Sequence, residues 1–129
     1  MDCWKFRARH MVPAHLAERV IYAHNSEVTL VRPNAEELDR VGAWIADKLN
    51  RCDGPVRLLM PRGGLSSIDR PTQPFYAPAA DDGLFRALER DLRQTEWRRL
   101  IDLPYHVNDP EFAEVLVAQF QGAVAQAGE

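Results

Sequence analysis

The clearest periodic pattern in the chain is an apolar repeat at helical spacing within residues 34–50. Asn34 stands at the start of this segment and Glu37 follows three residues later, which is the pattern of a capping box. The repeat ends before the triplet DGP at residues 53–55, a combination that stops helices. We therefore predict a helix over residues 34–50. Its apolar side consists of Leu38, Val41, Ile45 and Leu49, with Trp44 beside them.

Four short segments rich in β-branched or continuous apolar residues predict strands. They are residues 19–23 (RVIYA), 28–31 (VTLV), 56–60 (VRLLM) and 99–103 (RLIDL). A polar turn, HNSE, separates the first two. The third lies between two prolines and is almost entirely apolar, which is typical of a strand buried on both faces of a parallel sheet. The loop that follows, residues 61–80, is rich in Pro, Gly and Ser, and loops of this length are often functional.

Two further helices are predicted in the second half of the chain. Asp81 or Asp82 opens the first, which carries an apolar side made of Leu84, Phe85, Leu88 and Leu92. Asp109 and Pro110 start the last helix, because a capping carboxylate is followed by proline at the first helical position. The apolar stripe of this last helix is Phe112, Val115, Leu116, Phe120 and Val124.

The order of these elements is strand, strand, helix, strand, loop, helix, strand, helix, and residues 1–13 receive no assignment. This alternation predicts an α/β fold with a small, mostly parallel sheet and flanking helices. We expect residues 1–129 to form a single α/β domain that is part of a larger one. A bare parallel edge invites aggregation, so another segment or subunit is expected to cover it, and we predict a homo-oligomer.

Composition and charge narrow the class of protein. The chain has 129 residues, 46% of them hydrophobic and 27% charged, which suits one globular domain. A formal net charge of -3 gives no basic field for nucleic acid or for an anionic membrane surface. Cys3 and Cys52 fit no disulfide framework, and no stretch resembles a signal peptide or a membrane span. We therefore expect a cytoplasmic protein that binds neither nucleic acid nor membrane.

Polar residues follow each predicted strand. Ligands of open α/β sheets bind beyond the carboxyl ends of the strands. If the strands are parallel, these polar residues therefore lie together at one end of the sheet, which we call its rim. The candidate ligand-binding residues are His24 after the first strand, Arg32 after the second, Arg62, Gly63, Gly64, Ser66, Ser67 and Asp69 after the third, and His106, Asn108 and Asp109 after the fourth.

The loop PRGGLSSID, residues 61–69, is a candidate anion site. Its glycines permit close backbone approach, its hydroxyls donate hydrogen bonds, and the Arg62 guanidinium can bind two oxygens at once. The loop is neither a Walker loop nor a dinucleotide fingerprint. The alternative is a turn whose glycines satisfy backbone geometry and whose serines act as caps.

His106 is a candidate general acid or base, because histidine side chains exchange protons near neutral pH. The alternative is that Asn108 and Asp109 cap the following helix and that His106 is a hydrogen-bonded loop residue. His24 is similarly either a ligand contact or an ordinary turn histidine.

No metal site and no nucleophile stand out. Asp69, Asp81 and Asp82 do not have the spacing of a calcium loop, and no His/Cys cluster follows a zinc pattern. The chain contains no Gly-x-Ser-x-Gly elbow, and no base is evident for its serines. We predict no metal, and the sequence singles out no catalytic residue.

Four stretches in order resemble one protein family. They are HNSEVTLVRP (24–33), PRGGLSSID (61–69), PFYAPAADDGLF (74–85) and HVNDPEFA (106–113). The chain is similar in these stretches to the carboxy-terminal part of the Tm-one-like family, the bacterial and plant relatives of the tomato mosaic virus resistance protein. By motif position, the residues that match recurrent positions of the family are Gly63, Gly64, Ser66, Asp69, His106, Asn108 and Asp109.

The resemblance implies a protein of two Rossmann-like domains, in which ATP binding belongs to the amino-terminal domain. That domain has no counterpart in this chain, so we expect no cofactor here and a partnership with the missing domain or with a partner chain. Ala77 and Pro33 depart from the family pattern, where an acidic and a small polar residue are expected.

Three functions follow from these features. The first is a ligand-binding or regulatory module whose rim completes a site with the missing domain. The second is half of an enzyme active site for a small anionic substrate, with His106 and Asp69 as acid–base groups. The third is a structural or dimerisation domain.

Overall fold

A computed structural model of the chain describes residues 1–128. Its elements, in chain order, are β1 (Trp4–Phe6), η1 (Arg9–Met11), η2 (Ala14–Leu16), β2 (Ile21–Asn25), β3 (Val28–Val31), α1 (Ala35–Asn50), β4 (Val56–Pro61), α2 (Pro78–Asp91), β5 (Arg98–Leu103) and α3 (Pro110–Ala127). The α/β class predicted from the alternation of patterns is confirmed.

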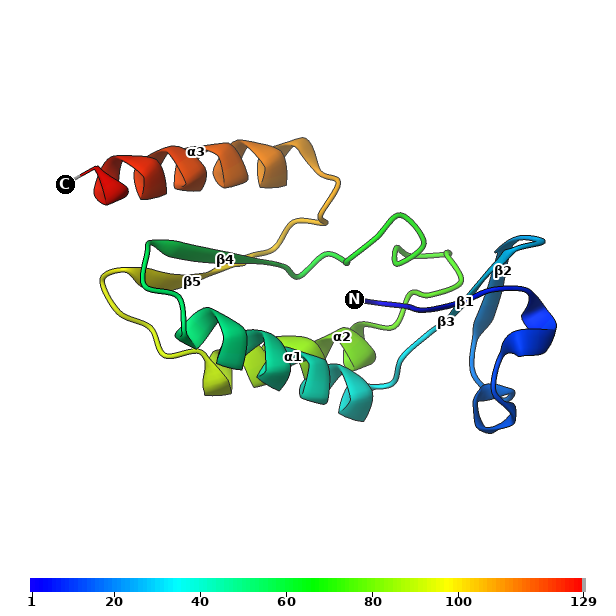
Figure 1. The fold of residues 1–129 in the computed structure, drawn as a ribbon. Helices are drawn as coiled ribbons and strands as arrows, with labels where there is room; N and C mark the ends of the chain where they lie inside the picture. The colour runs from blue at the N-terminus through cyan, green and yellow to red at the C-terminus, as the bar shows by residue number, and fades with distance from the viewer. Residues whose placement is uncertain (129) are drawn as a thin grey trace.

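The centre of the molecule is a βαβ unit in which β4 and β5 pair in parallel through the crossover helix α2. The register runs from Val56 opposite Arg98 to Pro61 opposite Leu103. Helices α1 and α2 lie side by side along one face of this sheet, and α3 lies over the other face (Figure 1). The parallel pairing places the loops after β4 and β5 at the same end of the sheet.

The first two predicted strands do not join this parallel sheet. They form the hairpin β2–β3, and β1 pairs with the other edge of β3, so a separate antiparallel sheet has the order β1-β3-β2. The reason is the short connection at Ser26 and Glu27, because adjacent strands joined by a tight turn are antiparallel and parallel strands need a long crossover. The β1 strand lies within the amino-terminal segment that the sequence left unassigned.

The observed first residues of the three helices can be compared with the capping residues predicted from the sequence. Asn34 and Glu37 form the predicted capping box at α1, with both hydrogen bonds at 2.9 Å. Helix α2 starts at Pro78, earlier than Asp81 or Asp82, because proline occupies its first turn and Asp81 is turned into the interior. Asp109 holds the cap position of α3 as predicted, but its carboxylate makes no capping hydrogen bond.

The main core lies between the sheet and the α1–α2 pair. Its buried members are Leu38, Ala46, Met60, Leu84, Phe85, Leu88 and Leu92. The two helices approach closely at Gly83, where a Cβ atom would lie 2.2 Å from the carbonyl oxygen of Ala35. Only glycine permits this backbone contact.

Helix α3 is the least covered element. Of its predicted apolar stripe only Phe112 is buried, and Leu116, Phe120 and Val124 are 48%, 67% and 55% exposed. Among the residues that the structure describes, none of the helices has the length and apolarity needed to cross a membrane.

Candidate functional site

Two loops meet at the carboxyl ends of β4 and β5, as predicted for a parallel pair. The Arg62 backbone N–H donates to the Leu103 carbonyl oxygen at 2.9 Å, and the Gly63 N–H donates to the Tyr105 oxygen at 2.9 Å. The Val107 N–H donates back to the Gly64 oxygen at 3.1 Å. These bonds join residues 62–70 and 105–109 into one structure, which we call the rim.

Gly64 lies in close contact with its own loop and with the second loop of the rim. Its φ is +130°, a conformation that residues with a side chain rarely adopt. A Cβ atom here would lie 2.2 Å from the Asp69 carbonyl oxygen and 2.7 Å from Cδ2 of His106. The glycine is therefore required for loop packing, which supports the structural interpretation of this motif.

His106 is buried in the rim, and both of its ring nitrogens are hydrogen-bonded. Nε2 lies 2.9 Å from the Ser66 carbonyl oxygen, which can only accept, so this nitrogen carries the hydrogen. Nδ1 accepts from the Asn108 backbone N–H at 3.0 Å and from the Arg70 guanidinium at 2.9 Å. Because both ring nitrogens are engaged within the protein, the arrangement favours a fixed, hydrogen-bonded imidazole over a general base.

Asp109 and Arg70 form the solvent-facing side of the rim. The Asp109 carboxylate accepts from the His106 backbone N–H at 2.8 Å and lies 3.4 Å from the Arg70 guanidinium. The Arg70 side chain remains 43% exposed. Asn108 contributes its backbone N–H to the ring of His106. Arg70 is therefore the cation that the rim presents to solvent.

The side chain of Arg62 points away from the other residues of the rim, toward α2. Its guanidinium hydrogen-bonds Asp102 at 2.7 Å, pairs with Glu89, and lies 4.7 Å from the centre of the Phe85 ring. The hydrogen bond that Arg62 donates to Asp102 is the main reason why the pKa of Arg62 is raised. Because two carboxylates already occupy this guanidinium, the geometry does not support the predicted anion contact by Arg62.

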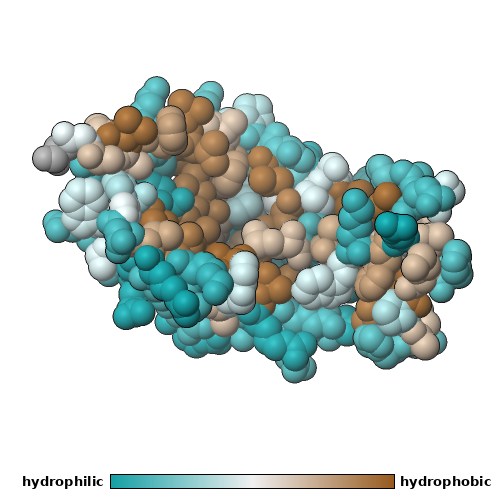
Figure 2. Space-filling model, in the orientation of Figure 1, coloured by the Kyte–Doolittle hydropathy of each residue, from teal (hydrophilic) through white to brown (hydrophobic). Residues whose placement is uncertain are grey.

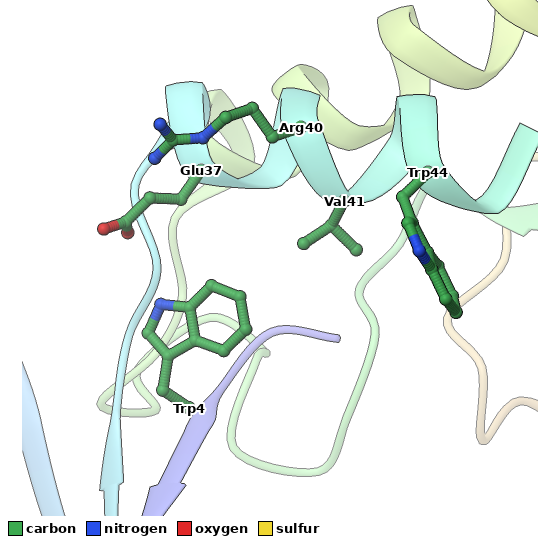
Figure 3. Close-up of a pocket in the computed structure, with 5 residues that line it drawn as sticks. All are labelled: Trp4, Glu37, Arg40, Val41 and Trp44. Atoms are coloured by element: carbon green, nitrogen blue, oxygen red, sulfur yellow. The ribbon is translucent and has the colours of Figure 1, made fainter. Parts of the chain in front are cut away.

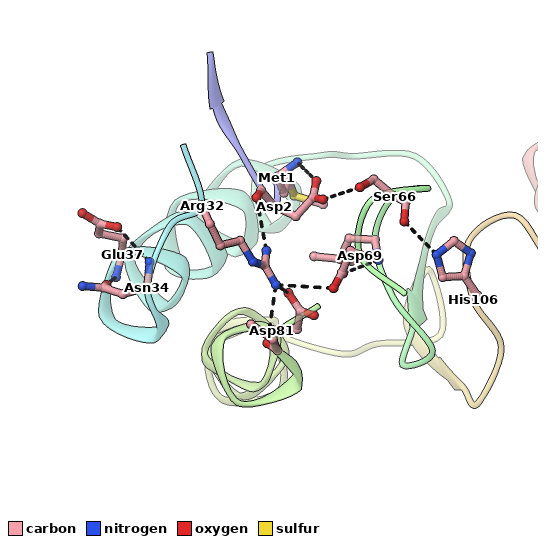
Figure 4. A network of polar contacts seen from close by, with 11 residues as sticks. Met1, Asp2, Arg32, Asn34, Glu37, Ser66, Asp69, Asp81 and His106 are labelled. Carbon is pink, nitrogen blue, oxygen red and sulfur yellow. Dashed lines mark hydrogen bonds and ion pairs between the residues drawn. The ribbon is translucent and has the colours of Figure 1, made fainter. Parts of the chain in front are cut away.

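Arg32 lies beneath the rim in a buried ionic cluster (Figure 4). Its guanidinium is 2.6 Å from an Asp81 oxygen and 3.6 Å from Oδ1 of Asp69, and all three side chains are almost completely buried. It also donates to the carbonyl oxygen of Asp2 at 3.2 Å. The other oxygen of Asp69 accepts from the Leu65 N–H at 2.8 Å. One guanidinium thus joins the end of β3, helix α2 and the Gly-Gly loop.

A third buried carboxylate, that of Asp2, reaches the rim from the amino-terminal segment. The Ser66 hydroxyl hydrogen-bonds the carboxylate of Asp2, which is buried (Figure 4). The Ser66 hydroxyl is therefore engaged in a hydrogen bond within the protein. Ser67, one residue later, is exposed, and none of the hydrogen bonds of the described residues uses its hydroxyl.

The cluster holds a carboxyl group whose pKa is strongly shifted. Burial, with a contribution from the neighbouring Asp69, raises the pKa of Asp81 to about 7, although Arg32 opposes the shift. Within residues 1–128, Oδ1 of Asp69 has no hydrogen-bond donor. The neighbouring Asp69 favours the protonated form of Asp81, because a protonated carboxyl group can donate to a carboxylate that would otherwise repel it.

This shift predicts that the free energy of unfolding falls as pH rises from about 4 to about 7, because the folded protein keeps a proton that the unfolded chain releases. The stabilising contribution of the Asp81 proton is fully present below the pKa that Asp81 has in the unfolded chain. It is lost as the pH rises through the pKa of Asp81 in the folded protein, and it amounts to about 4 kcal/mol at most. Asp81→Asn is expected to remove this slope in denaturant unfolding measured across that range. Asp82→Asn, at the exposed neighbouring position, serves as the control that keeps it. A slope that persists in Asp81→Asn would contradict the assignment.

His24 lies outside the rim. It is exposed on β2, with its ring 6.3 Å from that of Tyr22. The antiparallel hairpin carries it away from the end of the parallel sheet. The residues of the predicted set that the structure brings together are Gly63, Gly64, Ser66, Ser67, Asp69, His106, Asn108 and Asp109, with Arg32 beneath them.

Sequence reasoning missed the roles of three residues. Arg70 directly follows the PRGGLSSID stretch. Its place next to this candidate loop was the signal that could have identified it. Asp81 was interpreted as a helix start, and Asp2 had no signal because its partner Ser66 is 64 residues away. Among residues 1–128, no group of three or more His, Cys, Asp or Glu side chains could hold a metal ion.

A separate pocket of about 290 Å³ lies between β1 and α1 (Figure 3). It is lined by Trp4, Glu37, Arg40, Val41 and Trp44. The Glu37 carboxylate is already bound by Arg19, at 3.0 Å, and by the capping box. The pocket has mainly apolar walls and shares no residue with the rim, so the rim remains the candidate site.

The fold and the site together define an α/β domain built on a βαβ unit with a polar rim at its strand ends. The chain belongs to the uncharacterised protein family UPF0261, whose C-terminal domain model matches residues 1–124. The resemblance seen in the four motifs is thereby confirmed.

Individual relatives show that the match covers part of a longer protein. A UPF0261 protein of Rhizobium meliloti (strain 1021) is 44% identical over 121 residues, which are 94% of this chain and 30% of that protein. The ToMV resistance protein Tm-1(GCR237) of Solanum lycopersicum is 37% identical over 120 residues, 93% of this chain and 16% of that protein. A Clostridium tetani UPF0261 protein is 33% identical over 113 residues, with 88% and 28% covered. The chain thus spans less than a third of the length of these relatives.

Proposed function

We propose that this domain is a ligand-binding or regulatory module whose rim binds a small anion. The observation that carries the proposal is the exposed guanidinium of Arg70, held by His106 and Asp109 where the loops of two parallel strands meet. Ligands of open α/β sheets bind at this end of the strands. The contact between Arg70 and Asp109 is long, at 3.4 Å, so an incoming anion competes with a weakly held carboxylate.

The geometry supports binding better than acid–base catalysis. His106 uses both ring nitrogens within the protein, and Asp69 is fully buried beneath the loop. A general base needs a free nitrogen or oxygen within hydrogen-bond reach of the substrate. In this arrangement the two residues position Arg70 and the loop, and they leave Ser67 and Arg70 to face a ligand.

The test is a thermal-shift screen of the chain with phosphate, small carboxylates and nucleotides, with ATP included because the family resemblance implies it for the amino-terminal domain. A ligand at a hundred times its Kd stabilises by about 2.7 kcal/mol, which raises the midpoint by roughly 10 °C for a domain of this size. Arg70→Gln is expected to abolish the shift.

The matched control is Arg93→Gln, which removes an exposed arginine outside the rim and is expected to leave the shift unchanged. Equal loss in both variants would indicate a general charge effect. The absence of a shift with every compound would contradict binding of these ligands by the rim alone.

A further inference from the structure

Helix α3 is apolar on nearly all sides, yet the described residues cover it on one side only. After Glu114 the helix contains no charged residue. Its large side chains are half exposed or more at Val117, Phe120 and Val124, and Leu116 is 48% exposed. A helix that is hydrophobic all round is normally buried inside a larger structure.

A groove of about 340 Å³ runs between α3 and β4. It is lined by Pro55, Arg57, Leu59, Leu116, Gln119, Phe120 and Ala123. The space-filling view shows hydrophobic surface on α3 continuing into the hollow beneath it (Figure 2). At one end Arg57 donates to the Gln126 side-chain oxygen and ties α3 to the sheet. The groove is thus largely apolar, and a hydrogen bond attaches α3 to β4 at one end of it.

The sheet beside this groove is open. Strands β4 and β5 pair only with each other among residues 1–128, so each has one unpaired edge. Parallel sheets are normally covered on both faces and contain more strands than two. Helix α3 packs mainly against β4, and residues of both elements line the groove.

We propose that the groove is the docking surface for a strand and a helix from the amino-terminal part of the longer UPF0261 polypeptide. The strand adds in parallel to the free edge of β4, and the helix covers Leu116 and Phe120. The length of the relatives supports this occupant, because the chain matches a C-terminal domain and covers only 30% of the Rhizobium meliloti protein. A two-fold related second copy would instead place one β4 antiparallel to the other, which does not extend a parallel sheet.

The test compares thiol labelling at one position in two proteins. In this chain, Cys3 and Cys52 are replaced by serine and Phe120→Cys is introduced. In the Rhizobium meliloti protein, a cysteine is placed at the position aligned with Phe120, and its native cysteines are replaced. We expect labelling at least about 10-fold slower in the longer protein, at a rate independent of protein concentration, because docking must open before the thiol reacts.

Arg93→Cys and its aligned position provide the control, since this exposed site should label rapidly in both proteins. Equal labelling rates at the Phe120 position in the two proteins would overturn the proposal. Slow labelling of this chain that disappears on dilution would also overturn it, and would assign the groove to a second copy. Hydrogen exchange of the α3 region in the unmodified proteins gives the same comparison without a substitution.

Discussion

Replacing Arg32 with leucine is expected to lower the free energy of unfolding by about 3–5 kcal/mol at neutral pH, because it leaves a buried pair of carboxyl groups without their cation. Asp69 and Asp81 are 0% and 5% exposed, so water cannot take over the role of the guanidinium. The same side chain also donates to the Asp2 carbonyl oxygen, so the attachment of the amino-terminal segment is weakened together with the cluster. Denaturant unfolding followed by tryptophan fluorescence measures the loss.

The structure offers a matched control for this prediction. Arg90 also binds two carboxylates, those of Asp39 and Asp91, but its side chain is 54% exposed. Exposed ion pairs contribute little, so Arg90→Leu is expected to lower the free energy of unfolding far less than Arg32→Leu. The cost of Arg32→Leu should shrink as the pH is lowered, because the unpaired carboxylates then take up protons. A pH-independent loss, or equal losses in the two variants, would contradict the ionic account.

Gly64→Ala is expected to destabilise the protein by about 3 kcal/mol or more, through backbone strain and overpacking together. The added Cβ meets the Asp69 carbonyl oxygen at 2.2 Å and the His106 ring at 2.7 Å, and the φ of +130° does not suit alanine. Both neighbours belong to the rim, so any ligand-induced thermal shift should be lost as well. Unfolding free energy and the thermal shift are the two measurements.

Gly122→Ala provides a control for which the expected change in the free energy of unfolding has the opposite sign. Gly122 lies in α3, and a Cβ atom there meets nothing within 4 Å. Alanine at an exposed helix position is expected to stabilise by about 1 kcal/mol. If Gly64→Ala were also neutral or stabilising, the loops would be free to separate, and the proposed rim could not be a preformed site.

Local signals in the sequence predicted most of the helices and strands. The capping box at Asn34 and Glu37 and the proline after Asp109 marked two helix starts correctly, because these signals act within a single turn. The strands at β3, β4 and β5 were likewise predicted to within one residue at either end. A continuous apolar run is typical of a strand in a parallel sheet, and β4 pairs in parallel with β5 as this pattern predicted.

Only the tertiary structure decided how the polar residues are used. Arg32 bonds Asp81 across 49 positions of the chain, and Arg70 bonds His106 across 36, so no local pattern contains these pairs. The tight turn between β2 and β3 removed His24 from the rim, and three acidic neighbours from α2 and β5 turned Arg62 away from it. A residue's chemistry depends on its burial and its partners, and packing sets both only after distant segments have met.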